Sequence, residues 1–182
     1  VQMRAKQGDD ASCLNLNRIS RPRILGVNPN DLQGHFDIAT NIEENPSAYP
    51  PWGQLNAGNR EWIPAIADQT VLKWSLGKEV GDTLIYKNEA GEEIYLRFVV
   101  GLKASVFQGN VLISEEDFLK HFPSSSGSSV FLIDGDTTNC KEDFQLAFKD
   151  HGWTMTGAAE RLAQFKSVEN TYLSIFLILG AF

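Results

Sequence analysis

The C-terminal stretch of this 182-residue chain constrains its fold most. From Asn170 to Phe182 the sequence NTYLSIFLILGAF contains no charged residue, and nine of its last twelve residues are apolar. A helix of this length extends about 20 Å, at about 1.5 Å per residue, whereas a bilayer crossing takes roughly twenty apolar residues. We therefore expect residues 171–182 to be the start of a transmembrane helix. The alternative is a C-terminal core helix of an ordinary globular protein.

The segment before this stretch is amphipathic. Its apolar residues recur at spacings of three and four, at Leu162, Phe165, Val168 and Tyr172. This period predicts one helix over 158–179 that leaves a folded domain and enters a membrane. The opening residues, VQMRAK, alternate as a strand does and do not form a signal sequence. Such a chain is expected when an extramembrane domain is excised from a longer membrane protein.

The overall composition is that of a folded domain. Apolar residues make up 42% and charged residues 21% of the chain, which argues against extended disorder. The net charge is −7, from 16 basic and 23 acidic residues. A nucleic-acid-binding surface needs a basic stripe that displaces phosphate counterions, so we expect no nucleic-acid partner.

Strand-like runs dominate the middle of the chain. We predict strands at 1–6, 23–27, 62–67, 83–86, 94–100, 111–113, 130–133 and 153–156. Helices are predicted at 68–76, 115–122, 142–151 and 158–179, with Ser114 and Asp117 as a capping pair for the second. Asn88 and Gly91 supply the turn of a hairpin between two of the strands. Because strands and helices interleave, the predicted fold class is α+β.

The order of these elements predicts two lobes. Residues 1–36 and 135–170 would form one α+β lobe, and residues 37–134 would form a strand-rich lobe inserted into it. Residues 41–60 contain Pro46, Pro50 and Pro51, which exclude regular structure over most of that range. We expect a surface loop there, or a crossing between the lobes.

No constellation of catalytic residues is recognisable. His35, His121 and His151 each lack a second ligand at metal-binding spacing, and they are expected at the surface or at helix ends. The chain contains neither a phosphate-binding GxxxxGK[ST] loop nor a GxSxG nucleophile motif. We therefore predict no catalytic, cofactor-binding or metal-binding residues, and no enzyme activity.

The cysteines and tryptophans leave alternatives open. Cys13 and Cys140 lie in no CxxC pattern; they could form a disulfide outside the cytoplasm, or they could be two separately buried thiols. The four tryptophans could line an apolar groove or sit at a membrane interface. We expect them instead to pack in the core or between the lobes. They are Trp52, Trp62, Trp74 and Trp153.

Taken together, several segments resemble a known family. They are GDDASCLNLNRISRPRILGVNP, IPAIADQTVLKWSLGKEVGDTL, LRFVVGLKASVFQGNVLISEEDFLKHFP, SVFLID and RLAQFKSVENTYLSIFLILGAF. In this order they resemble the extracytoplasmic domain of FtsX-like ABC-transporter permeases, the group that includes MacB-type and LolC-type proteins. The resemblance covers nearly the whole chain and is least secure over 37–61. Its most specific part is the order of an IPAI strand, a helix, a GDTL strand, a VVG strand and an ISEEDF helix start.

The resemblance implies a fold, a location and partners. The domain would lie between two transmembrane helices of an inner-membrane protein, on the periplasmic side, with one porter-like lobe and one strand-rich insertion. A separate ABC ATPase subunit would drive it, a second permease would pair with it, and a periplasmic or outer-membrane protein could dock on it. A strand and helix expected near the start of the porter-like lobe are missing from this sequence or precede it.

These observations give the expected function. The domain would relay ATP-driven motion, through the stalk residues Leu162, Phe165, Val168 and Tyr172, to the export or extraction of a lipid, lipoprotein, peptide or drug-like molecule. A membrane-tethered binding or signalling module without transport is the second interpretation. A secreted hydrolase is the third.

Overall fold

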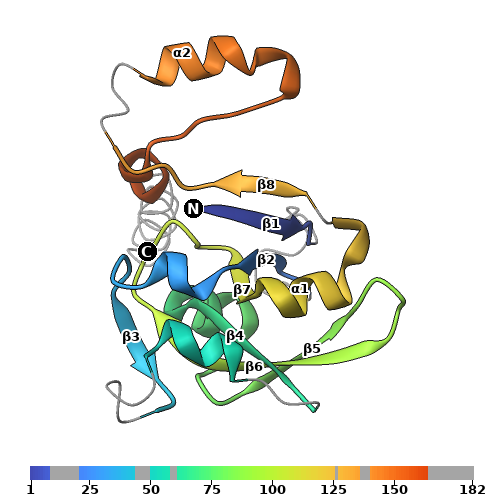
Figure 1. Ribbon diagram of the computed structural model, residues 1–182. Coiled ribbons are helices and arrows are strands. Elements are labelled where there is room, and N and C mark those ends of the chain that lie inside the picture. The colour runs from blue at the N-terminus through green and yellow to red at the C-terminus, as the bar shows by residue number, and fades with distance from the viewer. Residues whose placement is uncertain (9–20, 44–49, 58–60, 126, 136–139, 164–182) are drawn as a thin grey trace, which may run out of the picture. The chain divides into compact units, whose positions relative to one another are not determined.

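The computed structural model describes the chain in two compact units. Unit 1 is Val1–Leu132 and unit 2 is Ile133–Phe182. The residues described are 1–8, 21–43, 50–57, 61–125, 127–135 and 140–163, as drawn in colour in Figure 1.

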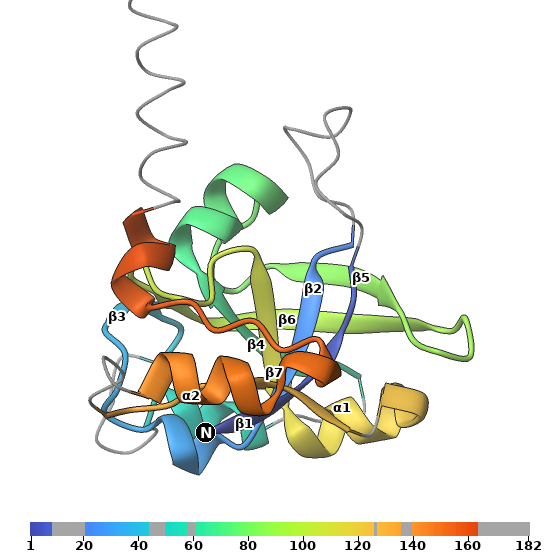
Figure 2. The same ribbon diagram turned by 90° about the horizontal axis from the view of Figure 1, so that it is seen from above.

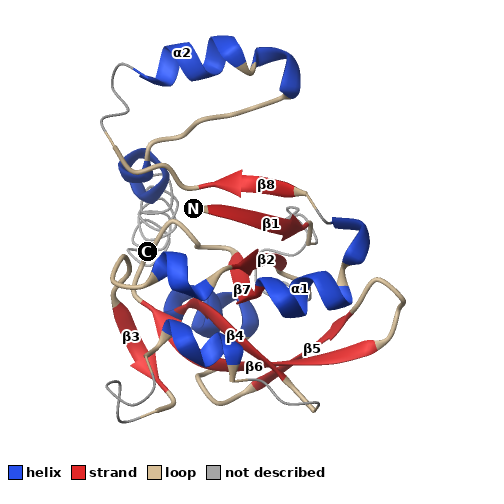
Figure 3. Cartoon of the chain, in the orientation of Figure 1, coloured by secondary structure: helices blue, strands red, loops and turns tan. Residues whose placement is uncertain are grey.

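Unit 1 is built on one mixed sheet of eight strands. The strands are β1 (Gln2–Lys6), β2 (Arg23–Val27), β3 (Ile38–Asn41), β4 (Ile63–Asp68), β5 (Thr83–Lys87), β6 (Glu93–Leu102), β7 (Asn110–Ser114) and β8 (Ser128–Phe131). The order across the sheet is β3-β6-β4-β7-β2-β1-β8, and β5 also pairs with β6. The β2–β7 and β4–β6 pairs are parallel and the others are antiparallel. With its helices, this sheet confirms the predicted α+β class (Figure 3).

The first face of the sheet, named here the α1 face, is covered by helix α1 (Glu115–His121) and the π-helix η3 (Val71–Leu76). Phe118 of α1 is fully buried against β2. It lies so close that a Cβ atom added to Gly26 would be 2.5 Å from the Phe118 ring. The glycine in β2 therefore allows the helix to approach the sheet closely.

The second face, named here the Trp52 face, is covered by two 3-10 helices, η1 (Pro29–Leu32) and η2 (Trp52–Asn56). Leu32, Trp52 and Leu55 from these helices are buried against the sheet. Because residues of β2 and β7 alternate between the two faces, Val111 points to the α1 face and Leu112 to the Trp52 face. Both faces are therefore apolar, and the sheet forms the middle layer of unit 1.

A β-bulge in β6 changes which face its residues occupy. Ala65 of β4 pairs with Phe98, but the next residue, Ile66, pairs with Val100, so Val99 is an extra residue. Phe98 belongs to the α1 face, whereas Val99 and Val100 both belong to the Trp52 face. An extra residue shifts the two-residue alternation by one position, which explains why both valines are buried on one side.

Two predicted local features are confirmed. The amide of Asp117 donates to the Ser114 hydroxyl at 3.1 Å, and that hydroxyl donates back to the Asp117 carboxylate at 2.7 Å, which caps α1. The β5–β6 hairpin turns through Asn88 and Gly91 and projects from the sheet (Figure 2). Its tip is tied to the end of α1, where the Ser124 amide donates to the Glu89 carboxylate at 2.9 Å.

The helix predicted at 68–76 is shorter and wider than expected. Asp68 ends β4, and the residues that follow form the π-helix η3, whose end is closed by Gly77 in the left-handed conformation, with φ 60°. The amides of Gly77 and Lys78 both donate to the Leu72 carbonyl. The left-handed glycine thus satisfies a terminal carbonyl of the helix.

Unit 2 contains the helix α2 (Cys140–Ala147), the 3-10 turn η5 (Lys149–His151) and a helix described over 158–163. In unit 1, η4 (Pro123–Ser125) precedes β8. Lys141 and Glu160 form an ion pair at 3.8 Å between α2 and the second helix. The strand predicted at 153–156 is wrong, because these residues form no strand. Their Trp-Thr-Met-Thr alternation fits a strand, but alternation alone does not supply a hydrogen-bonding neighbour.

Two predictions are not tested by this architecture. The predicted lobes, 1–36 with 135–170 and 37–134, join pieces of both units, so they stay a prediction about how the units assemble. The predicted transmembrane segment 171–182 lies outside the described residues. Within the described part of the chain, no helix has the length and apolar character needed to cross a membrane.

Candidate functional site

The most unusual polar group of unit 1 is the carboxyl group of Asp68. It is fully buried at the C-terminal end of β4, opposite Leu102 of β6. Since Ile66 lies on the Trp52 face, strand alternation places Asp68 on that face too. A carboxyl group without solvent contact needs either hydrogen-bond donors or a proton, because burial of an unpaired charge is costly.

Asp68 has one side-chain partner. The Ser105 hydroxyl donates to Asp68 Oδ2 at 3.1 Å and accepts the backbone amide of Phe107, also at 3.1 Å. Asp68 Oδ1 has no hydrogen-bond partner among the described residues. One oxygen of the carboxyl group is therefore left in apolar surroundings.

This environment changes the acidity of the group. Burial raises the pKa of Asp68 from its ordinary 3.8 to about 7, and the hydrogen bonds from Ser105 oppose the shift only in part. At neutral pH the carboxyl group is thus close to the midpoint of its titration. It can therefore hold or release a proton at neutral pH.

The turn between β6 and β7, residues 103–109, is built around this pair. The Asn110 side-chain amide donates to the carbonyls of Phe107 and Gln108, each at 3.1 Å. Phe107 is buried, and its ring centroid lies 4.8 Å from that of Phe36, which in turn lies 5.9 Å from that of Trp52. Contacts therefore run from the buried carboxyl group, through the turn, to the helices that cover the Trp52 face.

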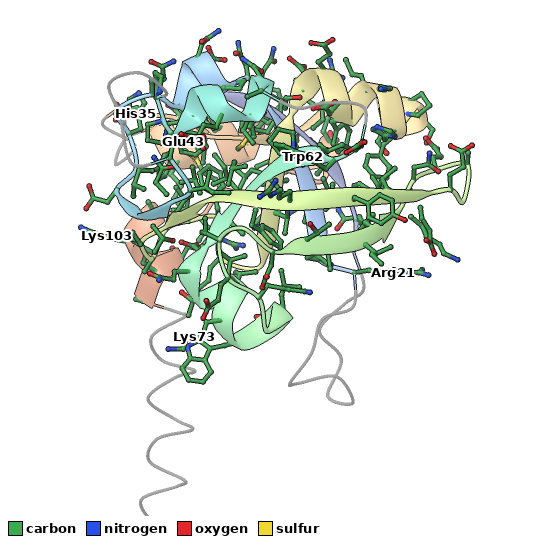
Figure 4. The ribbon with its side chains drawn as sticks, turned by 90° about the horizontal axis from the view of Figure 1, so that it is seen from below. Arg21, His35, Glu43, Trp62, Lys73 and Lys103 are labelled. Atoms are coloured by element: carbon green, nitrogen blue, oxygen red, sulfur yellow. The ribbon has the colours of Figure 1, made fainter. Side chains whose placement is uncertain are left out.

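Two of the four tryptophans are not core residues. Trp52 is buried as predicted, and Trp62 is partly buried with the Arg97 guanidinium 5.2 Å from its ring centroid (Figure 4). Trp74 is 70% exposed on η3, where the Lys73 ammonium lies 5.4 Å from its ring, and Trp153 is 39% exposed. Exposed aromatic rings flanked by cations suit contacts with apolar or anionic partners.

The hairpin β5–β6 adds a second exposed apolar area. Ile85 and Tyr95 are cross-strand neighbours, and both point away from the α1 face. They are 56% and 44% exposed, respectively. A lone exposed apolar residue needs no explanation, and this pair is too small to define a docking surface by itself.

The aromatic residues of unit 2 stack on one another. The ring of Phe148 lies 5.9 Å from that of Phe144 on α2 and 4.9 Å from that of Trp153. The helix that follows begins where the amide of Arg161 donates to the Gly157 carbonyl at 2.9 Å. These contacts organise the residues that lead into the apolar C-terminal sequence.

Of the predicted stalk residues, the structure describes Leu162, which is half-buried in the 158–163 helix. Phe165, Val168 and Tyr172 lie outside the described residues. So does Cys13, and nothing is described of the Cys140 side chain, although its backbone begins α2. The stalk stripe and the Cys13–Cys140 disulfide therefore stay predictions.

The histidines occupy the predicted kinds of position. His121 ends α1 and His151 ends the turn η5. Burial and the neighbouring Lys120 lower the pKa of His121, so a neutral imidazole is favoured there. Within the described ranges, no group of three or more histidine, cysteine or acidic residues is arranged to hold a metal ion.

The sequence contains a weak signal for the Asp68 site. In IPAIAD an acidic residue follows directly on an apolar strand, and the residues after it are apolar again. An acid at such a position is buried when the next element turns back over the strand end. Its partner Ser105 is 37 positions away, and no spacing rule connects the two.

Comparisons with known proteins give a likeness to solved structures. No protein-family model matches the chain, and no curated protein matches it. Among solved structures, it is similar to the extracellular domain of the noncanonical ABC-type transporter YknZ from Gram-positive bacteria. The TM-score is 0.39, the sequence identity is 14%, and the match covers 85% of this chain and 73% of that one. Because this TM-score is low, the function proposed below rests on the chain's own residues.

Proposed function

We propose that this chain is the non-catalytic extracytoplasmic domain of an ABC-transporter permease. It would relay the ATP-driven motion of a separate ATPase to the export or extraction of a substrate. The substrate would be a lipid, a lipoprotein, a peptide or a drug-like molecule. In the cell the domain would face the periplasmic side of the inner membrane, in a permease that acts as a dimer.

The observation that carries this proposal is the order of elements formed by the motifs of the family resemblance. IPAI lies in β4, the residues after it form η3, GDTL leads into β5, and VVG ends β6. ISEEDF spans the end of β7 and the capped start of α1. Each motif thus adopts the strand or helix that the resemblance requires, in the required sequence.

A second observation supports the proposed coupling route. The helix at 158–163 contains Leu162, the first residue of the amphipathic stripe, and the uncharged sequence 170–182 follows it. A helix resists compression along its axis, and packed helices have discrete arrangements. A continuous helix from unit 2 into a bilayer would therefore transmit a displacement produced by the ATPase.

The proposal is tested by placing a charge in the stripe. In the full permease with its ATPase, reconstituted in vesicles, Phe165→Asp should lower transport-coupled ATP turnover about fivefold or more, because coupling energies of this kind correspond to such factors. Ser167→Asp is the matched control, since at about 100° per residue it would lie on the side of the predicted helix opposite to Phe165. The thermal unfolding of unit 1 should be the same in both variants.

The alternatives predict different results. Unchanged coupling in Phe165→Asp, with normal insertion into the vesicles, would refute the stalk role. Equal losses in Phe165→Asp and Ser167→Asp would also contradict it, because a nonspecific effect of charge would then explain the change. ATP turnover that never depends on this domain would instead favour the tethered binding or signalling module.

A further inference from the structure

The Asp68 carboxyl group is buried at the base of the 103–109 turn, and its burial depends on that turn. We propose that Asp68 is a proton-binding site whose protonated carboxyl group, together with Ser105, latches the 103–109 turn onto the Trp52 face. Loss of the proton releases the turn. This inference does not depend on the proposed transport function.

The hydrogen-bond inventory favours the protonated form. The Ser105 hydroxyl has one proton, which it donates to Asp68 Oδ2, and its oxygen accepts the Phe107 amide. Asp68 Oδ1 has no described donor. An ionised carboxylate can accept hydrogen bonds at both of its oxygens, so this site would leave one oxygen of an ionised Asp68 without a hydrogen bond. Burial of a neutral carboxyl group costs far less free energy than burial of an ionised one.

Among the described residues, no neighbouring charge compensates for ionisation of Asp68. Four elements pack against β4, and two of them, β7 and η2, contain no charged residue. The third, η3, contains Lys73. The fourth, β6, contains Glu93 and Arg97 and is followed by Lys103. Lys73 and Arg97 lie over tryptophan rings, and Lys103 pairs with Asp37 at 3.4 Å on the surface. Burial accordingly raises the pKa of Asp68, and the side-chain and backbone hydrogen bonds of Ser105 oppose this rise in part.

The turn is the element that ionisation would displace. The carboxylate regains water when Ser105 and Phe107 move away from the end of β4. Ser105 holds the Phe107 amide, and the Phe107 ring packs against Phe36. Release of the turn would therefore uncover apolar surface next to Phe36 and change the Trp52 face. A proton at one buried oxygen thus controls whether a surface turn is closed.

Nuclear magnetic resonance on the 182-residue chain tests this latch. The side-chain carbonyl signal of Asp68 should titrate far above the ordinary 3.8. Protection of the Phe107 and Asn110 amides against hydrogen exchange, corrected for the intrinsic pH effect, should fall about tenfold per pH unit between about pH 5 and pH 7. In Asp68→Asn this pH dependence should vanish, whereas in the control Asp143→Asn, which removes an exposed carboxyl group of α2, it should stay.

A second comparison separates local release from global unfolding. The amide of Leu25, in the centre of the sheet, reports global unfolding and should exchange more slowly than that of Asn110 at every pH. Ser105→Ala should reduce Phe107 protection at low pH, and Ser105→Thr, which keeps the hydroxyl, should restore it. The proposal is overturned if Asp68 titrates near 3.8, if turn protection is independent of pH, or if Asn110 and Leu25 exchange at one rate. The last two readouts use the unmodified chain, so they decide the question even if a variant fails to fold.

Discussion

Replacing Asp68 by asparagine should change the pH dependence of stability in a predictable way. The raised pKa means that between pH 3.8 and about 7 the folded chain holds a proton that the unfolded chain has lost. Stability from this group is therefore fully present below pH 3.8, falls as the pH rises toward 7, and stays reduced above it. Asparagine does not titrate, so the variant lacks this decline.

The size of the effect follows from the shift. Moving the pKa from 3.8 to about 7 corresponds to about 4 kcal/mol of lost stability across that interval, at about 1.4 kcal/mol per unit. Near pH 4 the variant should be less stable by about 1–3 kcal/mol, because the amide adds a buried donor without a partner. Near pH 8 the variant should instead be more stable than the wild type, because the buried charge of Asp68 then costs more free energy than the unpaired amide.

Urea unfolding at 25 °C, followed by far-UV circular dichroism at several pH values, measures both curves. The decisive quantity is the difference in the free energy of unfolding between variant and wild type, because the titration of all other groups cancels. Asp143→Asn is the matched control: its side chain is exposed on α2, so this substitution should change the free energy of unfolding by less than about 0.5 kcal/mol.

Parallel curves for Asp68→Asn and the wild type would refute the reasoning. Asp68 would then have an ordinary pKa in the folded chain, which requires solvent or a donor at Oδ1. A decline in the opposite direction, with the wild type gaining stability as the pH rises, would mean that Asp68 is stabilised as an anion.

Two further variants test the packing of α1. Gly26→Ala should destabilise unit 1 by about 1–3 kcal/mol in urea unfolding, because the new methyl group would lie 2.5 Å from the Phe118 ring. Gly53→Ala is the control: the atom nearest to its new methyl group would be 3.8 Å away, so this variant should have nearly the stability of the wild type. Ser114→Ala should lower the free energy of unfolding by about 1–2 kcal/mol, because it removes the cap of α1, whereas Ser114→Thr should retain most of the wild-type stability. Equal stability of the alanine and threonine variants would contradict the capping role.

Sequence patterns predicted those parts of the fold that depend on local rules. Strand-like apolar runs identified β2 and β7, the Asn88–Gly91 pair identified the hairpin turn, and Ser114 identified the start of α1. The bulge in β6 could not be predicted in this way. In the run Phe98-Val99-Val100 every residue is apolar, so the sequence contains no sign of the change of face.

The candidate site depended on contacts that the sequence does not encode locally. Asp68 and Ser105 come from different elements, and only the folded turn brings them within 3.1 Å. Trp74 is 70% exposed and lies outside the core of unit 1, although aromatic residues in strand-rich domains are usually buried; its packing between the predicted lobes stays a prediction. The adjacent Val71 and Leu72 fill the α1 face, which leaves Trp74 on the outer side of the same π-helix.

The bulge and the buried carboxyl group are parts of one arrangement. Because Val99 is inserted, Val100 and Leu102 face the same side as Ile66, and Leu102 pairs with Asp68 at the end of β4. Strand β6 therefore ends on the Trp52 face, and the turn that follows folds over the carboxyl group on that face. If β6 ran through these residues without the bulge, alternation would turn Val100 and Leu102 toward the α1 face, where η3 already lies. The one-residue irregularity thus positions Ser105 over Asp68 and makes a proton-sensitive turn possible in an otherwise apolar sheet.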